Sequence, residues 1–348
     1  MRVEPYAVAL RAPLGTAHGA ITERRGFVVR VDADGHEGVG EASPLPDWTE
    51  NVHACERALS RAADAIADGD VMARSSQTDA LDATDDAPAA RHGVSLAFLD
   101  AEAKRAGRPL YRHLGADAPV ERVPVNATVG DANAETTAER VGEAVAAGFE
   151  TVKVKVGARS LDADLARLRA VRAAAPDVAV RVDANAAWDR ETAARAFDAL
   201  ADLAVEYVEQ PLSADDLGGH AALRGGAVGV ALDESVAAHG VEDVLDAGAA
   251  DAAVLKPMAL GGPDRTVDAG RRAREAGVEP VVTTTFDAVY ARTAAVHAAA
   301  ALAPLPACGL ATASALDGDL APDPARVVGG AVAVPQGKGN GVSTANGE

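Results

Sequence analysis

The sequence predicts an α/β fold in which a closed (β/α)7β barrel, similar to a TIM barrel, follows a smaller α+β domain. Beyond about residue 121, short apolar runs alternate with alanine-rich helical patterns, with about 25 residues to each unit. Strict alternation of strands and helices is typical of a parallel sheet. In addition, charged residues end five consecutive runs, as expected where barrel strands open onto an active site.

The first third of the chain lacks this rhythm and predicts an α+β domain, which we place at residues 1–120. Residues 1–45 have the pattern of strands, with a hairpin turn at "DADGHEG". Residues 50–68 and 91–106 have helical patterns. The polar, acidic stretch between them, 70–90, predicts a surface connection with little core.

The barrel is predicted over residues 121–311, and residues 312–348 are expected to pack back on the N-terminal domain. Seven strands are expected at 123–129, 151–156, 178–185, 205–211, 228–235, 252–257 and 278–285, with an eighth near 307–311. Eight strands favour a closed barrel. An open, doubly wound sheet would carry a glycine-rich phosphate loop after its first strand, and "VPVNATVGDANAE" has none.

Composition limits where such a protein works and what it binds. The 52 acidic and 33 basic residues give a net charge of −19, so we expect neither nucleic acid nor a membrane as a partner. Acidic residues spread along the chain are typical of a halophile-like protein in a salty cytosol. No long apolar run, no signal-peptide pattern and only two cysteines predict a cytoplasmic protein. The sequence leaves open whether the protein forms a homo-oligomer.

The charged residues at the strand ends form the candidate active site. They are Lys153 and Lys155, then Asp183, Glu209, Asp233 and Lys256, with 23–28 residues from one strand to the next. Because this spacing is one strand–helix unit, the side chains should lie at one height around the barrel mouth. Three carboxylates brought together repel one another, and a divalent cation relieves that repulsion. Carboxylate oxygens suit Mg²⁺, so Asp183, Glu209 and Asp233 are the predicted metal ligands.

The lysines suit the removal of a proton beside a bound carboxylate. A cation that binds a substrate carboxylate makes the neighbouring proton more acidic by stabilising the enediolate. A lysine can accept that proton if neighbouring positive charges lower its pKa. Lys153 and Lys155 alternate with valines and therefore point into the barrel together. Lys155, nearer the rim, is the better candidate for the base, and Lys153 for electrostatic support.

Two further polar residues stand beside this set. Glu234 follows Asp233 and, by strand alternation, is expected to point away from the ligands, in a supporting role. Asn185, two residues after Asp183, either hydrogen-bonds near the metal site or caps the following helix.

The order and spacing of these motifs resemble the enolase superfamily, in its muconate-lactonizing subgroup. The matching motifs are "KVK", "DAN", "EQP", "DES" and "KP", which contain the six charged residues. Residues 88–115 resemble the helix that links this family's capping domain to its barrel. The resemblance implies Mg²⁺ as the cofactor, with Mn²⁺ as a substitute, and a small carboxylate as the substrate.

Within the subgroup, "TTTFDAVYART" and "GLATASALDGDLA" resemble the o-succinylbenzoate synthases of menaquinone biosynthesis. This resemblance implies a carbon–oxygen lyase that dehydrates 2-succinyl-6-hydroxy-2,4-cyclohexadiene-1-carboxylate in the syn sense. Lys155 would remove the proton and then protonate the departing hydroxyl. Lys256 would stabilise the enediolate, and Lys153 would help hold the carboxylate.

Other activities of the same superfamily stay open. An N-succinylamino acid racemase would use Lys155 and Lys256 as two opposed bases, and a muconate cycloisomerase shares the same residues. A dipeptide epimerase would carry an Asp-x-Asp pair on the last strand, which "ACGLATA" lacks. A non-catalytic barrel is disfavoured because all six charged positions are intact.

Substrate contacts beyond the charged set come from other segments. Thr283, Thr284 and Thr285 end the seventh strand and could bind the carboxylate of the succinyl group. In the family, two loops of the capping domain cover the pocket, and residues 13–19 and 43–51 match them. Thr16 and His18 are candidates there, and a plain hairpin loop is the alternative for the first of these stretches.

Overall fold

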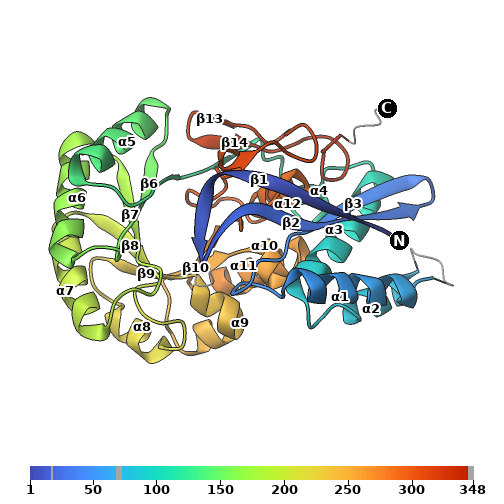
Figure 1. The fold of residues 1–348 in the computed structure, drawn as a ribbon, viewed down its shortest axis with the longest axis horizontal. Helices are drawn as coiled ribbons and strands as arrows, with labels where there is room; N and C mark the ends of the chain where they lie inside the picture. Colours follow the sequence, from blue (N-terminus) through green and yellow to red (C-terminus); the bar gives the residue numbers. More distant parts are fainter. Residues whose placement is uncertain (17–18, 68–72, 344–348) are drawn as a thin grey trace.

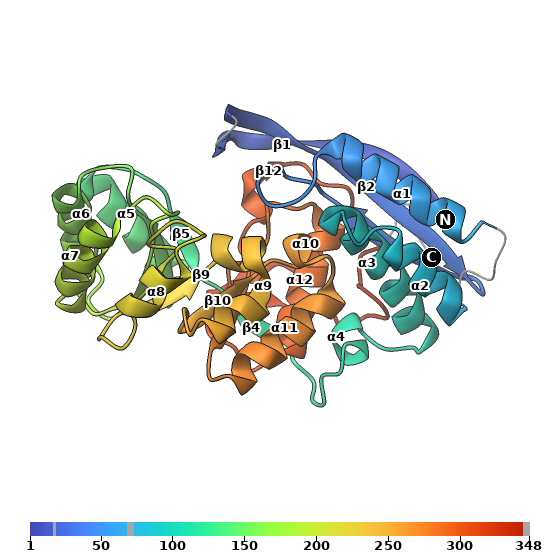
Figure 2. The same ribbon diagram turned by 90° about the horizontal axis from the view of Figure 1, so that it is seen from below.

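The chain folds into a barrel of parallel strands with an antiparallel sheet and helices beside it (Figure 1). The computed structural model describes residues 1–16, 19–67 and 73–343. Figure 2 shows the helices α5 to α8 at one end of the molecule and the N-terminal strands with α1 and α2 at the other. Across the described residues, no helix is both long and apolar enough to cross a membrane.

The N-terminal sheet is antiparallel, in the order β12-β1-β2-β3. Its strands are β1 (Arg2–Thr16), β2 (Gly19–Ala33), β3 (His36–Ala42) and β12 (Leu316–Asp317). The predicted hairpin turn joins β2 to β3 through Asp34 and Gly35, whose φ angles are 55° and 80°. Two positive φ angles match the right-handed twist of a two-residue hairpin, which explains an Asp-Gly pair there.

Four helices follow this sheet. They are α1 (Val52–Ala65), α2 (Arg74–Asp82), α3 (Pro88–Arg105) and α4 (Leu110–His113). Helix α3 lies directly on β3, and the absence of a side chain at Gly40 allows this close approach. A Cβ at Gly40 would stand 1.9 Å from the carbonyl oxygen of Gly93. The helices predicted at 50–68 and 91–106 are confirmed as α1 and α3.

The predicted surface connection at 70–90 is wrong in part, because it contains α2 and the start of α3. Ser76 and Ala80 of α2 are buried. Small side chains allow close packing without an obvious apolar stripe, so the polarity of this stretch concealed the helix.

The barrel is a seven-stranded parallel sheet in sequence order from β5 to β11. Its strands are β5 (Ala127–Val129), β6 (Thr151–Lys155), β7 (Ala179–Asp183), β8 (Val205–Glu209), β9 (Gly229–Leu232), β10 (Ala252–Leu255) and β11 (Glu279–Val282). Two parallel bridges, Val125 to Cys308 and Thr283 to Gly309, place the segment around 308 between the two edges. The predicted eighth position therefore closes the ring.

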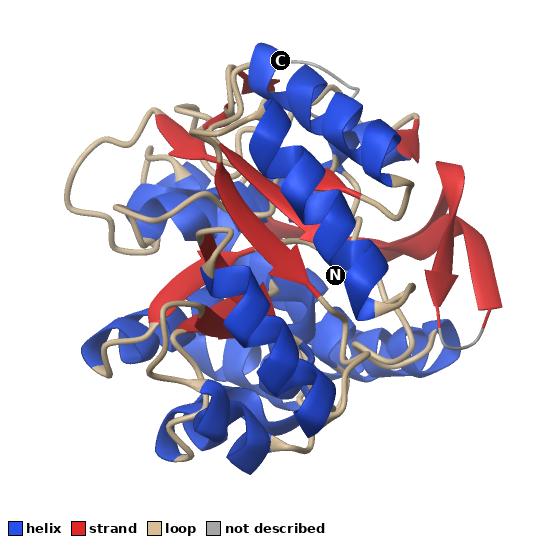
Figure 3. Cartoon of the chain, turned by 90° about the vertical axis from the view of Figure 1, so that its left-hand side faces the viewer, coloured by secondary structure: helices blue, strands red, loops and turns tan. Residues whose placement is uncertain are grey.

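Helices follow the barrel strands and cover them from outside (Figure 3). They are α5 (Ala134–Ala146), α6 (Leu161–Ala174), α7 (Arg190–Ala201), α8 (Leu217–Leu223), α9 (Glu234–Asp246), α10 (Pro257–Leu260), α11 (Pro263–Glu275) and α12 (Val289–Ala301). A short 3-10 turn, η1 (Ala313–Ala315), precedes β12. A small antiparallel sheet joins β4 (Arg122–Pro124), β14 (Ala331–Ala333) and β13 (Val327–Val328).

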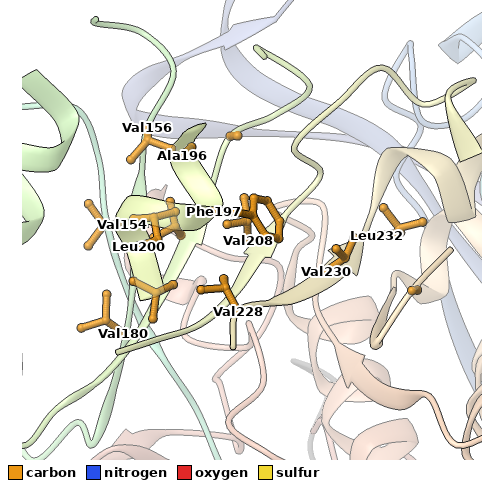
Figure 4. Close-up of a cluster of buried hydrophobic side chains, with 14 of the residues drawn as sticks. Val154, Val156, Val180, Ala196, Phe197, Leu200, Val208, Val228, Val230 and Leu232 are labelled. Carbon is orange, nitrogen blue, oxygen red and sulfur yellow. The ribbon is translucent and has the colours of Figure 1, made fainter. Parts of the chain in front are cut away.

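Period-two alternation decides which side chains face the barrel interior. Val154, Val180 and Val208 belong to one core with Phe197 and Leu200 of α7 (Figure 4). A separate cluster, with Tyr207, Val254 and Val281 among its members, takes the alternate positions of its strands. The charged strand ends share the second parity, so they too point inward.

Candidate active site

The six charged residues singled out in the sequence line one cavity at the carboxyl ends of the barrel strands. The cavity has a volume of about 850 Å³. In a ring of eight positions, β6 and β10 stand four steps apart, so their lysines lie on opposite sides of the mouth. The three carboxylates occupy the arc between them, at the ends of β7, β8 and β9.

Lys153 contacts two of the three predicted ligands at once. Its Nζ donates to Glu209 Oε1 and Oε2 at 2.8 and 3.0 Å and lies 3.1 Å from Asp183 Oδ2. Burial would lower the pKa of Lys153, but the charges of Asp183 and Glu209 outweigh it and raise the pKa well above its ordinary value. Lys153 therefore carries a permanent positive charge among the acids.

Lys155 stands nearer solvent, as its position closer to the rim predicts. Its side chain is 37% exposed, against 14% for Lys153. The Lys155 Nζ donates to Asn185 Oδ1 at 2.6 Å and lies 2.8 Å from Asp183 Oδ2. Lys155 is therefore the lysine most open to a molecule in the cavity.

Asn185 hydrogen-bonds to residues of the candidate site. Besides accepting from Lys155, it donates through its side-chain amide to Glu234 Oε1 at 3.1 Å. Its backbone N–H donates to Asp183 Oδ1, and its φ of 43° places it in the left-handed region that asparagine tolerates. Helix α7 is capped by Asp189 instead, whose Oδ1 accepts from Thr192 N–H.

Lys256 is enclosed on two sides. Its Nζ donates to Asp233 Oδ2 at 2.6 Å and lies 3.1 Å from the centre of the Trp48 ring. Trp48 belongs to the loop after β3 that was expected to cover the pocket, and it lines the cavity with Leu45, Pro46 and Asp47. The indole face and the carboxylate together hold the ammonium group of Lys256.

Glu234 lines the cavity, contrary to the expectation that it points away. Strand alternation ends one residue earlier than assumed, because Asp233 has helical backbone angles (φ −115°, ψ −72°) and stands at the start of α9. Burial raises the pKa of Glu234, and Lys256 opposes that shift. Glu234 is thus a partly buried acid facing the same cavity as the predicted ligands.

The three predicted ligands differ in their tendency to ionise. Burial works to raise the pKa of Asp183, but Lys153 and Lys155 outweigh it and hold the pKa below its usual range. Burial and the charge of Asp183 raise the pKa of Glu209 to about 7. Burial also raises the pKa of Asp233, against the pull of Lys256. Burial therefore disfavours the charged forms of Glu209 and Asp233, whereas the two lysines keep Asp183 ionised.

The donor set of Asp183, Glu209 and Asp233 fits a hard divalent cation. All three are buried, and Asp233 Oδ1 has no hydrogen-bond partner among the described residues. As they stand, no three acidic, histidine or cysteine side chains in the described ranges form a group that could hold an ion. Lys153 contacts Asp183 and Glu209 at 3.1 and 2.8 Å, and Lys256 contacts Asp233 at 2.6 Å. Mg²⁺ would replace part of these lysine contacts.

The predicted threonines reach the cavity as well. Thr283, Thr284 and Thr285 all line it, and Thr284 shares a hydrogen bond of 2.8 Å with Thr312. His18 and the side chain of Thr16 lie outside what the structure describes, so their predicted role stays a prediction.

Two residues in or near the site were missed in the sequence. Trp48 was not singled out within its loop, although a tryptophan is a signal in a chain with two tryptophans and 3% aromatic residues. The buried acid Glu41, at the end of β3, was also missed. Burial and the charge of Asp287 raise the pKa of Glu41 to about 7. An acid within the apolar run "GVGEASPL" could have indicated it.

Two family models match the chain. Residues 136–347 match the family described as "Enolase C-terminal domain-like", and residues 2–101 match "MenC, N-terminal domain".

Relatives of known activity include synthases and a racemase. The chain is 42% identical to the o-succinylbenzoate synthase of Thermobifida fusca over 64% of this chain and 69% of the relative. It is 33% identical to the o-succinylbenzoate synthase of Thermosynechococcus vestitus over 84% of this chain and 86% of the relative. It is 27% identical to the N-succinyl-L-Arg/Lys racemase of Bacillus cereus over 84% of this chain and 82% of the relative.

Among solved structures, the chain is similar to the dipeptide epimerase from Enterococcus faecalis complexed with Mg and L-Leu-L-Tyr. The two share 27% identity and a TM-score of 0.86, with 98% of each chain covered. The barrel with an accompanying N-terminal domain is therefore a fold that this chain shares along its whole length.

Proposed function

This chain belongs to the enolase superfamily, and we propose that within it the protein is an o-succinylbenzoate synthase. The proposed reaction is the syn dehydration of 2-succinyl-6-hydroxy-2,4-cyclohexadiene-1-carboxylate in menaquinone biosynthesis, so the enzyme is a carbon–oxygen lyase. The N-terminal family match and the two synthase relatives support this choice over other members of the superfamily.

The observation that carries the proposal is that the two opposed lysines differ in how far they are exposed to the cavity. Lys155 is partly exposed to the cavity, whereas Lys256 is enclosed by Asp233 and Trp48. A dehydration that removes the proton and the hydroxyl from one face of the ring needs one lysine as acid and base. A racemisation needs an available base on each face.

In the proposed reaction, Lys155 accepts the proton from the carbon beside the substrate carboxylate. The electron pair of that C–H bond forms the new ring double bond as the C–O bond breaks. Lys155 then gives the proton to the departing hydroxyl, and water leaves. Lys256, across the mouth, balances the negative charge that develops on the substrate. Because Asn185 holds Lys155 Nζ at 2.6 Å, the ammonium group is kept in place between the two transfers.

Asp183, Glu209 and Asp233 would hold Mg²⁺, which supplies positive charge beside the substrate carboxylate and makes the neighbouring proton more acidic. Lys153 stays protonated between Asp183 and Glu209 and orients both acids. We further propose that the hydroxyl group of Thr284 binds the succinyl carboxylate, since Thr284 lines the cavity and can donate while it accepts from Thr312.

A second candidate is an N-succinylamino acid racemase. Lys155 and Lys256 face one another across the mouth, which is the arrangement that two opposed bases require, and a racemase is among the relatives. Muconate cycloisomerase is a more distant alternative.

The test is a direct comparison of two substrates with Mg²⁺ present. We expect turnover of the cyclohexadiene substrate, followed by the growth of aromatic absorbance, to exceed racemisation of N-succinylamino acids, followed by circular dichroism. EDTA should stop the turnover and added Mg²⁺ should restore it. Racemisation without dehydration would contradict the proposal and favour the second candidate.

A further inference from the structure

A cluster of buried charges joins the N-terminal sheet to the barrel, and the proposed chemistry does not use it. Arg24 of β2, Glu41 of β3 and Asp287, between β11 and α12, are each at most 2% exposed. Burying charged groups is costly unless other groups satisfy them. The contacts of this cluster therefore indicate what it does.

Glu41 caps a helix of the barrel. Its Oε1 accepts from Ala288 N–H at 2.8 Å and its Oε2 from Ala291 N–H at 2.9 Å. The N-cap residue of α12, Ala288, provides no side-chain cap of its own. A carboxylate at a helix N-terminus satisfies free N–H groups and the helix dipole. The N-terminal sheet is thereby attached to the segment that follows the threonines.

Arg24 holds the base of the loop that carries Trp48. Its guanidinium donates to the carbonyl oxygens of Ser43 and Pro44, at 2.9 and 3.2 Å, and to Ser43 Oγ at 2.9 Å. The residues directly after Pro44, numbers 45–48, line the cavity. The same guanidinium lies 4.0 Å from Asp287 Oδ1.

Residues 45–48 form one wall of the cavity and residues 283–286 form another. Asp287 holds the second of these walls. Its carboxylate accepts from both the backbone N–H and the hydroxyl of Thr285, which lines the cavity beside Thr284 and Phe286. Arg24 therefore holds the segment that leads into residues 45–48, and Asp287 holds Thr285 in the second wall. The two charged groups lie next to each other.

We propose that Arg24 and Asp287 are positioning residues that set the spacing between residues 45–48 and residues 283–286, and with it the fit of the substrate. Neither side chain lines the cavity, so each acts through the wall that it holds. The kinetic part of the test rests on the proposed synthase function, whereas the part that follows coupling between the walls does not.

The first experiment measures hydrogen–deuterium exchange in Arg24→Met and Asp287→Asn. Each variant is expected to raise exchange in both walls, measured over residues 43–50 and 283–288. The reason is that losing the contact between Arg24 and Asp287 loosens both of the segments that the pair holds. Asp287→Asn is nearly isosteric and carries the test if Arg24→Met does not fold. Exchange that rises only in the wall nearest the substitution would overturn the proposal.

The matched control is a partly buried contact between the same two parts of the molecule. Arg91 of α3 lies 3.1 Å from Asp264 Oδ2 of α11, and neither residue lines the cavity. Asp264→Asn should lower the melting temperature without raising exchange in either wall.

The second experiment compares steady-state kinetics. Asp287→Asn and Arg24→Met should each raise KM by about 10-fold and lower kcat less, because the lysines and acids stand on other strands. The double variant should be no worse than the more severe single variant, since the two residues act as a unit. Additive effects, or an equal rise in KM for Asp264→Asn, would refute the positioning role. A wild-type protein without dehydratase activity would count against the proposed function and leave the exchange result to decide this inference.

Discussion

Lys155 and Lys256 stand on opposite sides of one cavity, and their surroundings differ. Lys155 is partly exposed and bound by the neutral amide of Asn185 as well as by Asp183. Lys256 is almost closed off, with the carboxylate of Asp233 on one side and the ring of Trp48 on another. Two identical side chains can thus be given different chemistry by their neighbours.

The difference shows that two lysines in one cavity need not both act as bases. Lys155 is more open to the cavity, and its Nζ contacts the neutral amide of Asn185 as well as the carboxylate of Asp183. Lys256 is held between an anion and an aromatic face and is less open to the cavity. The comparison therefore favours one acid–base lysine and one electrostatic lysine, and the following substitutions test that division.

The largest effect is expected for Lys155→Ala. Removing the proposed base should lower kcat for dehydration by about 10³-fold, within the range that general acid–base catalysis contributes. Lys155→Arg should not restore activity, because a guanidinium stays protonated. Circular dichroism and the melting temperature serve as the control for folding. Retained turnover in the alanine variant would remove Lys155 from the mechanism.

Lys256→Ala should cost less, about 10²-fold in kcat, as expected for the loss of one electrostatic contact to developing charge. Lys256→Arg should recover part of the loss, because charge rather than proton transfer is required. This pattern is measured in the same assay as for Lys155. If the arginine variant is as inactive as the alanine variant, Lys256 transfers a proton and the two lysines are equivalent.

A smaller effect is expected for Trp48→Leu. Removing the aromatic face frees Lys256, and racemisation of N-succinylamino acids relative to dehydration should rise by about 2- to 30-fold, the equivalent of one cation–π contact. Trp48→Phe keeps an aromatic face and is the matched control. An unchanged ratio in the leucine variant would show that Trp48 does not enclose Lys256 in solution.

The smallest effect concerns stability without metal. Since the pKa of Asp183 is lowered, its contribution to stability is present above about pH 3.9, the ordinary carboxyl value, and is lost as the pH falls through the folded pKa. Since the pKa of Asp233 is raised, its contribution is present below that value and is lost as the pH rises through the folded pKa. At pH 7 in EDTA, Asp183→Asn should therefore lower the melting temperature more than Asp233→Asn does. The reverse order would contradict these pKa directions.

Much of the site was predictable because it follows local periodicity. Alternation along β6 correctly placed Lys153 and Lys155 on one face, and both reach Asp183 Oδ2. The strand–helix repeat brought the carboxylates to the same end of neighbouring strands. Where alternation failed, at Glu234, the strand had already turned into a helix.

The rest could not be predicted because it depends on contacts between distant parts of the chain. Glu41 binds the N–H of Ala288, 247 residues further along, and no local pattern indicates that pairing. The same holds for Trp48 on Lys256, since its loop could have taken many conformations above the barrel. Helix α2 escaped notice for a related reason, because its burial comes from its neighbours rather than from an apolar stripe of its own.

By itself, the sequence determined the kind of side chain at each strand end and the inward direction of each one, because both follow from the two-residue and strand–helix periods. Only the tertiary structure decided how those side chains differ. Closing the ring at Cys308 set the lysines opposite one another, and the loop after β3 enclosed Lys256 but not Lys155. That distinction arises from packing between separate elements, where burial and neighbouring charge change the properties of identical groups.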